Sequence, residues 1–413
     1  MSSIRKGLLQ TVFHGAYMKR WNDKLRPAEL YEVDKQAHKM IIAWVLLQEN
    51  TRDLAAEDRR LLGDKIVEGG IFDYLFRLVI TDIKPPVFYR IKENPEHYRQ
   101  LVEWVQGELK PVLSPLGEDF WHRFIAYCDP SREKDLVDEI LSAAHFYASN
   151  WEFKLIEGLN GFDEEVAEIR ESFAEKERSF QHLKKFPELM NSKVHALGKF
   201  ANLCGQLRFQ KRWSQMPRIP ETSVMGHMFL VACYSYFFSV VNKACPARRQ
   251  NNFFCGLFHD LPEMLTRDII SPVKKSVDKL DKLIKDYEDE ELERRVFEPL
   301  TSEGYTDLVA KLRYFLGTAT GSEFHDTVII DGEIKRVSFE ELQQLYNDNA
   351  YNPKDGEMLK VCDEIAAFIE AYTAVRNGIS INELHQAMWR LKDKYKKRSI
   401  GKIHIGALMS DFD

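Results

Sequence analysis

Two segments of this 413-residue sequence match when they are compared at an offset of 186 residues. "GIFDYLFRLVITDIKPPV" (70–87) aligns without a gap with "GLFHDLPEMLTRDIISPV" (256–273), and seven of the 18 positions are identical. Segments of one chain that share a pattern in this way are expected to adopt the same local structure. The match therefore constrains the fold more than any single motif does.

Two shorter matches keep the same order along the chain. "KRW" occurs at 19–21 and again at 211–213, and "LSAAHFYA" (141–148) corresponds to "LKVCDEIA" (359–366). Three matching blocks in a preserved order are typical of a duplicated unit rather than of chance. The sequence therefore predicts two copies of one domain that divide near residue 190.

Hydrophobic periodicity predicts helices in both copies. "FDEEVAEIRESFAEKERSF" (162–180) has one apolar stripe on a charged rod, which is typical of a connecting helix. "SVMGHMFLVACYSYFFSVV" (223–241) is apolar almost all round, as expected of a central helix. "TVIIDGEIKRVSF" (327–339) predicts a β-hairpin, because Asp331 and Gly332 form a two-residue turn between β-branched runs. The fold class is therefore all-α, with tandem helical bundles (1–190 and 191–413) and a small hairpin insertion.

Composition narrows the class of protein. A chain with 44% hydrophobic residues readily buries a core, and a net charge of −6 gives no support for general nucleic-acid binding. The six cysteines include no C-x-x-C pair, which argues against zinc ribbons and a disulfide framework. Residues 1–20 carry four basic residues at 5, 6, 19 and 20, and no uninterrupted apolar run reaches 18 residues, so neither a signal peptide nor a membrane span is indicated. We expect a cytoplasmic protein without nucleic-acid or membrane partners.

Four residues of the second copy are candidate metal ligands: His227, His259, Asp260 and Asp363. Two imidazoles and two carboxylates suit one divalent transition metal ion such as Mn²⁺, Fe²⁺, Co²⁺, Ni²⁺ or Zn²⁺. Neighbouring residues of a helix point about 100° apart, so His259 and Asp260 can reach one ion only near a helix end. Each of these residues alone is more often structural, and their combination favours a metal site.

The first copy differs at the corresponding positions. Opposite His259, Asp260 and Glu263 stand Asp73, Tyr74 and Arg77, in that order. A phenol and a guanidinium are poor metal ligands, so this copy is expected to be degenerate, without a metal but with the same scaffold. Weak binding of an ion by His38, Asp73 and His145 is the alternative.

The second copy resembles a known family. "RW…ETSVMGH…HDLPEMLTRDIISPVK…CDEIAAFIEAY", between about 195 and 375, is similar to the His-Asp (HD) superfamily of metal-dependent phosphohydrolases and, more narrowly, to its bacterial 5'-deoxynucleotidase branch. The resemblance implies tandem HD-type bundles, the first degenerate. It also implies these roles: metal ligands His227, His259, Asp260 and Asp363, catalytic residues Glu263 and Asp268, and nucleotide-pocket residues Arg212 and Trp213. Lys274 is a further candidate for a phosphate contact.

The implied function is hydrolysis of a phosphomonoester, with a (deoxy)nucleoside 5'-monophosphate as the expected substrate. Glu263 would orient or deprotonate the attacking water, and Asp268 would assist the leaving oxygen. A phosphodiesterase of the same superfamily is one alternative, but it needs additional histidines, and only His325 lies between the HD pair and Asp363. A non-catalytic nucleotide-binding signalling protein is the other. A small phosphorylated substrate is the expected partner, and a homodimer is left open.

Overall fold

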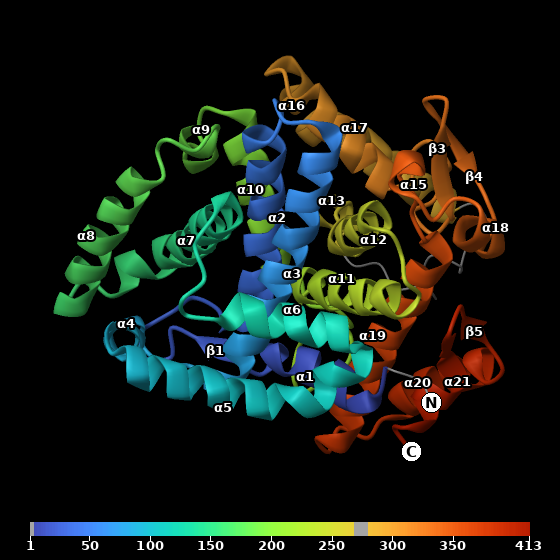
Figure 1. Cartoon of the computed structure of the whole chain (residues 1–413), viewed down its shortest axis with the longest axis horizontal. Helices are drawn as coiled ribbons and strands as arrows, with labels where there is room; N and C mark the ends of the chain where they lie inside the picture. Colours follow the sequence, from blue (N-terminus) through green and yellow to red (C-terminus); the bar gives the residue numbers. More distant parts are fainter. Residues whose placement is uncertain (1–3, 268–279) are drawn as a thin grey trace.

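The computed structural model describes residues 4–267 and 280–413. Within these ranges helices dominate, and the strands form three antiparallel sheets of two strands each (Figure 1). The predicted all-α class is confirmed.

The first half of the chain consists mainly of helices, among which α2 packs against both α3 and α7. Its elements are α1 (Lys6–Phe13), β1 (Lys19–Arg20), β2 (Leu30–Tyr31), α2 (Glu32–Asn50), α3 (Ala56–Ile80), α4 (Pro85–Glu93), α5 (Pro95–Leu113), α6 (Glu118–Cys128), α7 (Leu136–Ile156) and α8 (Glu164–Ser179). Helix α8 is the predicted charged connecting helix, and Asp163 caps its first turn by accepting a hydrogen bond from the Glu165 amide.

The second half repeats part of this order and adds the hairpin. Its elements are α9 (Phe186–Met190), α10 (Ala196–Gln206), α11 (Val224–Val241), α12 (Pro246–Phe258), α13 (Glu263–Thr266), α15 (Leu280–Leu292), α16 (Glu298–Ser302), α17 (Thr306–Phe315), β3 (Thr327–Ile330), β4 (Glu333–Arg336), α18 (Phe339–Gln344), α19 (Gly356–Arg376), α20 (Asn382–Tyr395), β5 (Ser399–Ile400), β6 (Ile403–His404) and α21 (Ile405–Ser410).

The hairpin prediction is confirmed. Strands β3 and β4 pair in the antiparallel register that places Ile330 opposite Glu333. Asp331 and Gly332 between them have φ angles of 54° and 81°, and a tight turn of this kind needs positive φ at both residues. Aspartate tolerates this conformation and glycine adopts it freely, which explains why the dipeptide predicts the turn.

The two halves place matching segments in matching positions. By sequence order and neighbours, α1 corresponds to α10, α2 to α11, α3 to α12 and α7 to α19. Helix α2 packs against α3 and α7, just as α11 packs against α12 and α19. Helices α2 and α11 also pack against each other, and so do α3 and α12 (Figure 1). Equivalent helices therefore meet at the centre of the molecule.

Two glycines of the repeated segment allow close helix contact. A Cβ atom on Gly256 of α12 would lie 2.7 Å from the backbone of Ala232 in α11, and one on Gly70 of α3 would lie 2.1 Å from the Met40 sulfur in α2. Gly256 therefore allows α12 to approach the backbone of α11 closely, whereas Gly70 leaves room for the Met40 side chain.

Helix α11 is the one described helix that is long and apolar enough to cross a membrane. In this fold 89% of its apolar stretch is buried inside the protein. A central helix that is surrounded by other helices has the same composition as a membrane span. Helix α11 is therefore interpreted as the predicted core helix.

The halves also exchange contacts at their first helices. Helix α1 packs against α11, and α10 packs against α2, so each lies on the central helix of the other half. The Tyr234 hydroxyl in α11 donates a hydrogen bond to the Leu9 carbonyl in α1 at 2.9 Å. Buried apolar residues from both halves form one continuous cluster. Separation of the halves would therefore expose apolar surface on each.

We expect residues 191–413 expressed alone to be insoluble or to aggregate, because α11 and α12 would lose their cover from α2 and α3. Exposure of even about 400 Å² of apolar surface costs about 10 kcal/mol at about 25 cal/mol per Å². Solubility of the fragment, measured by size-exclusion chromatography, checks this. Co-expression with residues 1–190 is expected to restore a soluble complex, and a soluble, folded fragment on its own would contradict the expectation.

Candidate metal centre

Helix α12 ends at Phe258, and the neighbouring residues His259 and Asp260 follow directly after this end. His259 is the C-cap, and the chain then turns before α13 begins at Glu263. Because the helical repeat stops there, the backbone can direct two neighbouring side chains toward one point, which a regular helix prevents. Nε2 of His259 lies 3.2 Å from Oδ2 of Asp260. The pair thus lies at a helix end, as the sequence predicts.

Two further helices bring His227 and Asp363 to the same point. His227 lies in the first turn of α11, and Asp363 lies in α19. Nε2 of His227 is 3.0 Å from Oδ1 of Asp363 and 3.9 Å from Oδ2 of Asp260. Ligand atoms of His227, His259 and Asp363 all lie within 4.8 Å of one another. Three helices therefore bring together the four residues that the sequence proposes as metal ligands.

The surroundings of the Nδ1 atoms of the two imidazoles fit a metal site. Nδ1 of His259 lies 2.8 Å from the Gly256 carbonyl, to which it donates, and Nδ1 of His227 faces the Glu370 carboxylate at 3.4 Å. A neutral imidazole held through Nδ1–H presents the lone pair of Nε2 to the centre. Nε2 of His259 is buried and has no hydrogen-bond partner within residues 4–267 and 280–413. Two such nitrogens and two carboxylates suit a borderline divalent ion.

The charges of the centre attract a cation. Burial disfavours the charged imidazolium of His259, yet the Asp260 carboxylate raises the pKa of His259 to about 9. Burial opposes the charged carboxylate of Asp363, but its contacts with His227 and Lys360 hold its pKa well below the usual range. The buried carboxylates therefore favour positive charge nearby, which is a proton on His259 in the absence of an ion, and a divalent ion would replace that proton.

Glu370 of α19 connects this centre to the "KRW" loop. Its side chain is fully buried, and one oxygen accepts hydrogen bonds from Trp213 Nε1 at 2.9 Å and Arg212 Nε at 3.4 Å. The other oxygen accepts from the Thr222 hydroxyl at 2.9 Å and faces His227 Nδ1. A carboxylate in this position fixes the orientation and tautomer of a ligating imidazole. Glu370 is therefore a positioning residue for His227.

Glu370 was not among the residues that the sequence analysis singled out, although a signal for it exists. His145 and Asp363 correspond at an offset of 218 residues, and the same offset places Glu152 opposite Glu370. An identical acidic residue seven positions after a candidate ligand, in both copies, could have marked the position. The match of "LSAAHFYA" with "LKVCDEIA" stops short of it.

The two predicted nucleotide-pocket residues lie on either side of Glu370. Nη1 of Arg212 is 3.3 Å from Oδ2 of Asp260, and the Arg212 side chain is 12% exposed. Trp213 packs against a small cluster that includes Leu384. Arg212 is therefore next to a candidate ligand, while the Trp213 indole is held by packing and by its bond to Glu370.

Of the remaining predicted site residues, the structure describes Glu263 but not Asp268 or Lys274. Glu263 is the first residue of α13, three positions after Asp260, and its amide donates to the Asp260 carbonyl at 3.1 Å. Its side chain is partly buried. Asp268 and Lys274 lie outside the described residues.

Two lysines lie at the corresponding centre of the first copy. Lys39 Nζ is 2.5 Å from Oδ2 of Asp73, the counterpart of His259, and Lys35 Nζ is 2.7 Å from Nδ1 of His145, the counterpart of Asp363. Both lysine side chains are almost fully buried, and burial lowers the pKa of Lys35 to about 7. Ammonium groups thus contact the positions where a metal would need ligands.

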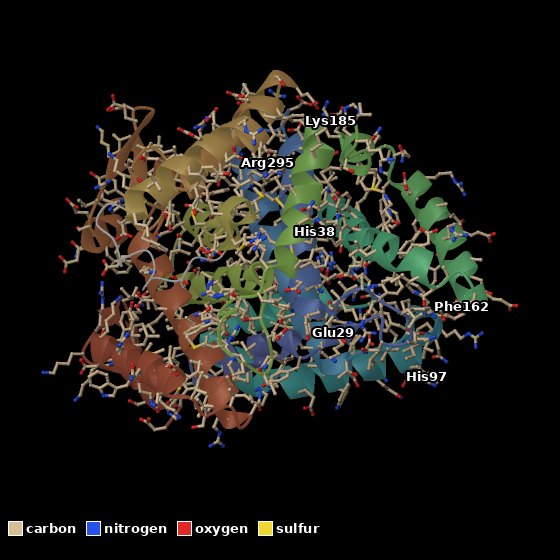
Figure 2. All side chains as sticks on the ribbon, turned by 180° about the vertical axis from the view of Figure 1, so that it is seen from behind. Glu29, His38, His97, Phe162, Lys185 and Arg295 are labelled. Atoms are coloured by element: carbon tan, nitrogen blue, oxygen red, sulfur yellow. The ribbon has the colours of Figure 1, made fainter. Side chains whose placement is uncertain are left out.

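His38, the counterpart of His227, is also occupied. Its Nε2 lies 3.0 Å from the Ala201 carbonyl in α10, and its Nδ1 lies 3.1 Å from Nη2 of Arg208. Figure 2 shows His38 near the middle of the molecule beside α10. Because both ring nitrogens are hydrogen-bonded, neither is available to an ion. The alternative of a weak ion site at His38, Asp73 and His145 is not supported.

The first copy nevertheless keeps the link between loop and glutamate. Arg20 Nε and Trp21 Nε1 donate to one oxygen of Glu152 at 2.8 and 3.0 Å. Trp21 and Trp213 share an unusual positive φ, at 57° and 55°. The unit of arginine, tryptophan and glutamate is therefore present in both copies, including the one whose ligand positions have changed. This distribution assigns the unit a structural role in addition to any contact with substrate.

A second acidic group of the described chain also has metal-like spacing. It consists of Glu188, His195 and Glu303, which are partly exposed. Glu188 accepts hydrogen bonds from Lys185 and Tyr305, and Glu303 accepts one from the Ala196 amide at 2.8 Å. These contacts explain the grouping without an ion.

Comparison with known proteins agrees with the geometry of the second half. Residues 204–392 match the family model of the HD domain, which supports membership of the HD superfamily of metal-dependent phosphohydrolases. HD domains are generally hydrolases and bind divalent metal ions. No curated protein and no solved structure matches the chain.

We expect the purified protein to hold about one divalent ion per chain, because among the described residues two imidazole Nε2 atoms and two carboxylates converge only in the second half. Asp260→Ala should lose most of the metal in elemental analysis. Asp73→Asn is the matched control in the first half and should retain it. Two tightly held ions per chain, or equal loss in both variants, would overturn this assignment.

Glu370→Gln should weaken metal binding by about 10- to 100-fold, because the neutral amide no longer polarises His227. Competition of the protein with a chromophoric chelator measures the affinity. Glu152→Gln removes the equivalent charge from the first half and should leave the affinity unchanged. An unchanged affinity in Glu370→Gln would limit Glu370 to holding the loop.

Proposed function

We propose that this protein is a metal-dependent phosphohydrolase that cleaves a phosphomonoester, with a (deoxy)nucleoside 5'-monophosphate as substrate. The observation that supports this most is the convergence of two Nε2 atoms and two carboxylates from α11, α12 and α19 in a partly accessible centre. A divalent ion held there would polarise a phosphoryl oxygen and acidify a water molecule.

The reaction adds the oxygen of water to phosphorus and breaks the bond between phosphorus and the ester oxygen. Glu263, which begins α13 directly after the turn that carries His259 and Asp260, is proposed to accept the proton of the attacking water. Asp268 is proposed to supply a proton to the departing alcohol oxygen. Arg212, beside Asp260, offsets negative charge on the phosphoryl group, and Lys274 is a second candidate for that contact. The products are orthophosphate and an alcohol.

One observation distinguishes this proposal from a binuclear phosphodiesterase. His325, the additional histidine available in the sequence, does not belong to either group of metal-like spacing in the described chain. A second ion beside the first therefore has no evident imidazole ligand. We place the protein in the cytoplasm, where its nucleotide substrate would occur, and its six unpaired cysteines accord with that location.

A screen of the metal-loaded, full-length protein tests the function. The panel contains deoxyribonucleoside and ribonucleoside 5'-monophosphates, p-nitrophenyl phosphate, bis(p-nitrophenyl) phosphate and cyclic dinucleotides. Release of orthophosphate from monoesters alone is the expected result. Cleavage of diesters would favour the phosphodiesterase, and nucleotide binding without any turnover would favour the signalling protein.

Glu263→Gln should keep the metal and lower turnover by about 10²-fold or more, which is the scale of a positioned general base. Steady-state rates and elemental analysis of the same preparation measure both quantities. Glu290→Gln, an exposed change on α15, is the control and should behave as the unmodified protein. Loss of metal in Glu263→Gln would make Glu263 a ligand instead.

A further inference from the structure

A cavity lies beside the metal centre, between the start of α19, the end of α20 and the segments that flank the hairpin. Its volume is about 390 Å³. Its wall includes Phe324, Phe339, Lys360, Tyr395 and Arg398. Ligand pockets for small molecules begin at a few hundred Å³, so this volume suits a group of about the size of a nucleoside.

Lys360 connects the cavity with the metal centre. It lines the cavity and lies one helical turn before Asp363, and its Nζ donates to Oδ2 of Asp363 at 2.8 Å. The other oxygen of Asp363 faces His227 Nε2 at 3.0 Å. One carboxylate therefore contacts a candidate ligand on one side and the cavity lysine on the other. A phosphoryl group at the metal centre would lie near the Lys360 ammonium.

The chemistry of the wall combines ring faces with polar groups. The Lys360 ammonium lies 4.4 Å from the centre of the Phe324 ring, and Tyr395 and Phe339 add two more aromatic side chains. His325 also lines the cavity, and its Nδ1 has no hydrogen-bond partner among the described residues. Aromatic faces suit a planar base, and an unsatisfied ring nitrogen suits a polar group of a ligand.

Positive charge lies at the rim of this cavity. Besides Lys360, the rim carries Lys394, which is paired with Glu364, and Arg398, which is paired with Glu357. The side chains of Lys394 and Arg398 are 45% and 40% exposed, so their charge reaches solvent. Asp326 and Glu357 also line the cavity and offset part of this charge, so the proposed phosphoryl contact depends on Lys360.

Arg212 and Trp213 also lie near the centre, and their polar groups contact protein carboxylates. Arg212 and Trp213 are both hydrogen-bonded to the buried Glu370, and the same unit recurs in the first half at Glu152. The Trp213 indole is therefore used to hold the loop. The indole N–H of Trp213, the residue proposed for a base or sugar face, is used by Glu370, whereas the wall of the cavity beyond Lys360 carries three aromatic side chains.

We propose that this cavity binds the alcohol portion of the phosphomonoester and that Lys360 contacts the phosphoryl group at its entrance. The inference rests on the proposed phosphohydrolase function and adds the position of the leaving group. Lys360 is thus a substrate-binding residue, and the substrate class is a phosphomonoester with a planar, nucleoside-sized alcohol.

Val337 provides a direct test, since it lines the cavity on the connection that follows β4. Val337→Trp places an indole in the cavity, and Val87→Trp on exposed α4 is the control for added bulk. With full-length, metal-loaded protein we expect Val337→Trp to lower kcat/KM for deoxyadenosine monophosphate at least about 10-fold. Activity on the small ester methyl phosphate should change less than about twofold, and thermal unfolding confirms that the variant folds. An equal loss on both esters, or no loss on either, would overturn the cavity assignment.

Lys360→Met supplies an independent measurement. At saturating metal we expect KM for deoxyadenosine monophosphate and the inhibition constant of orthophosphate to rise about 10-fold, because a charge-assisted hydrogen bond is lost. Lys360→Arg should restore much of the binding, and Lys110→Met, a change at an exposed position of α5, is the control. Unchanged orthophosphate inhibition would remove Lys360 from the phosphoryl contact.

The two proposals fail in different ways. If the unmodified protein hydrolyses no monoester, the proposed function is wrong, and calorimetric binding of deoxyadenosine monophosphate then decides the cavity. Weaker binding in Val337→Trp than in Val87→Trp would support the cavity even in that case. Equal binding by both variants would exclude it.

Discussion

Burial of the Glu370 carboxylate is the interaction on which the site depends. A charged group away from water must be paired and hydrogen-bonded. Glu370 meets this condition because it accepts hydrogen bonds from Arg212, Trp213 and the Thr222 hydroxyl, and because it faces His227. One residue of α19 thereby fixes a loop, the start of α11 and an imidazole of the candidate metal centre. His227 is connected to the loop through this carboxylate, because its Nδ1 lies 3.4 Å from the group that binds Arg212 and Trp213.

The two halves show which part of this arrangement belongs to the scaffold and which part to the metal. The first half keeps the glutamate, as Glu152, together with its arginine and tryptophan. At the positions that correspond to His259 and Asp363 it has Asp73 and His145, which contact Lys39 and Lys35. The first half thus combines the unit of arginine, tryptophan and glutamate with lysine contacts at the positions that correspond to ligands of the second half.

The halves also depend on each other. The Ser223 hydroxyl, which caps α11, accepts a hydrogen bond from the Gly226 amide and donates one to Asp34 of α2 at 2.6 Å. Arg208, just after α10, contributes to the buried charge of the first half by donating to Glu152 at 2.8 Å. The second half thus supplies a buried charge partner, Arg208, to the first half. The first half in turn holds the cap of α11, the helix that carries His227, through Asp34.

The sequence by itself determined the helical class, the hairpin at Asp331 and Gly332, the central helix 224–241 and the residues proposed as ligands. Local signals suffice for these features, because turn geometry and hydrophobic periodicity depend on neighbours along the chain. Only the tertiary structure decided that Glu370 orients His227, that Lys35 and Lys39 contact the first copy's ligand positions, and that a cavity opens beyond Lys360. These features join residues more than 30 positions apart, so they depend on how helices pack and on how buried charges are satisfied, which periodicity does not encode.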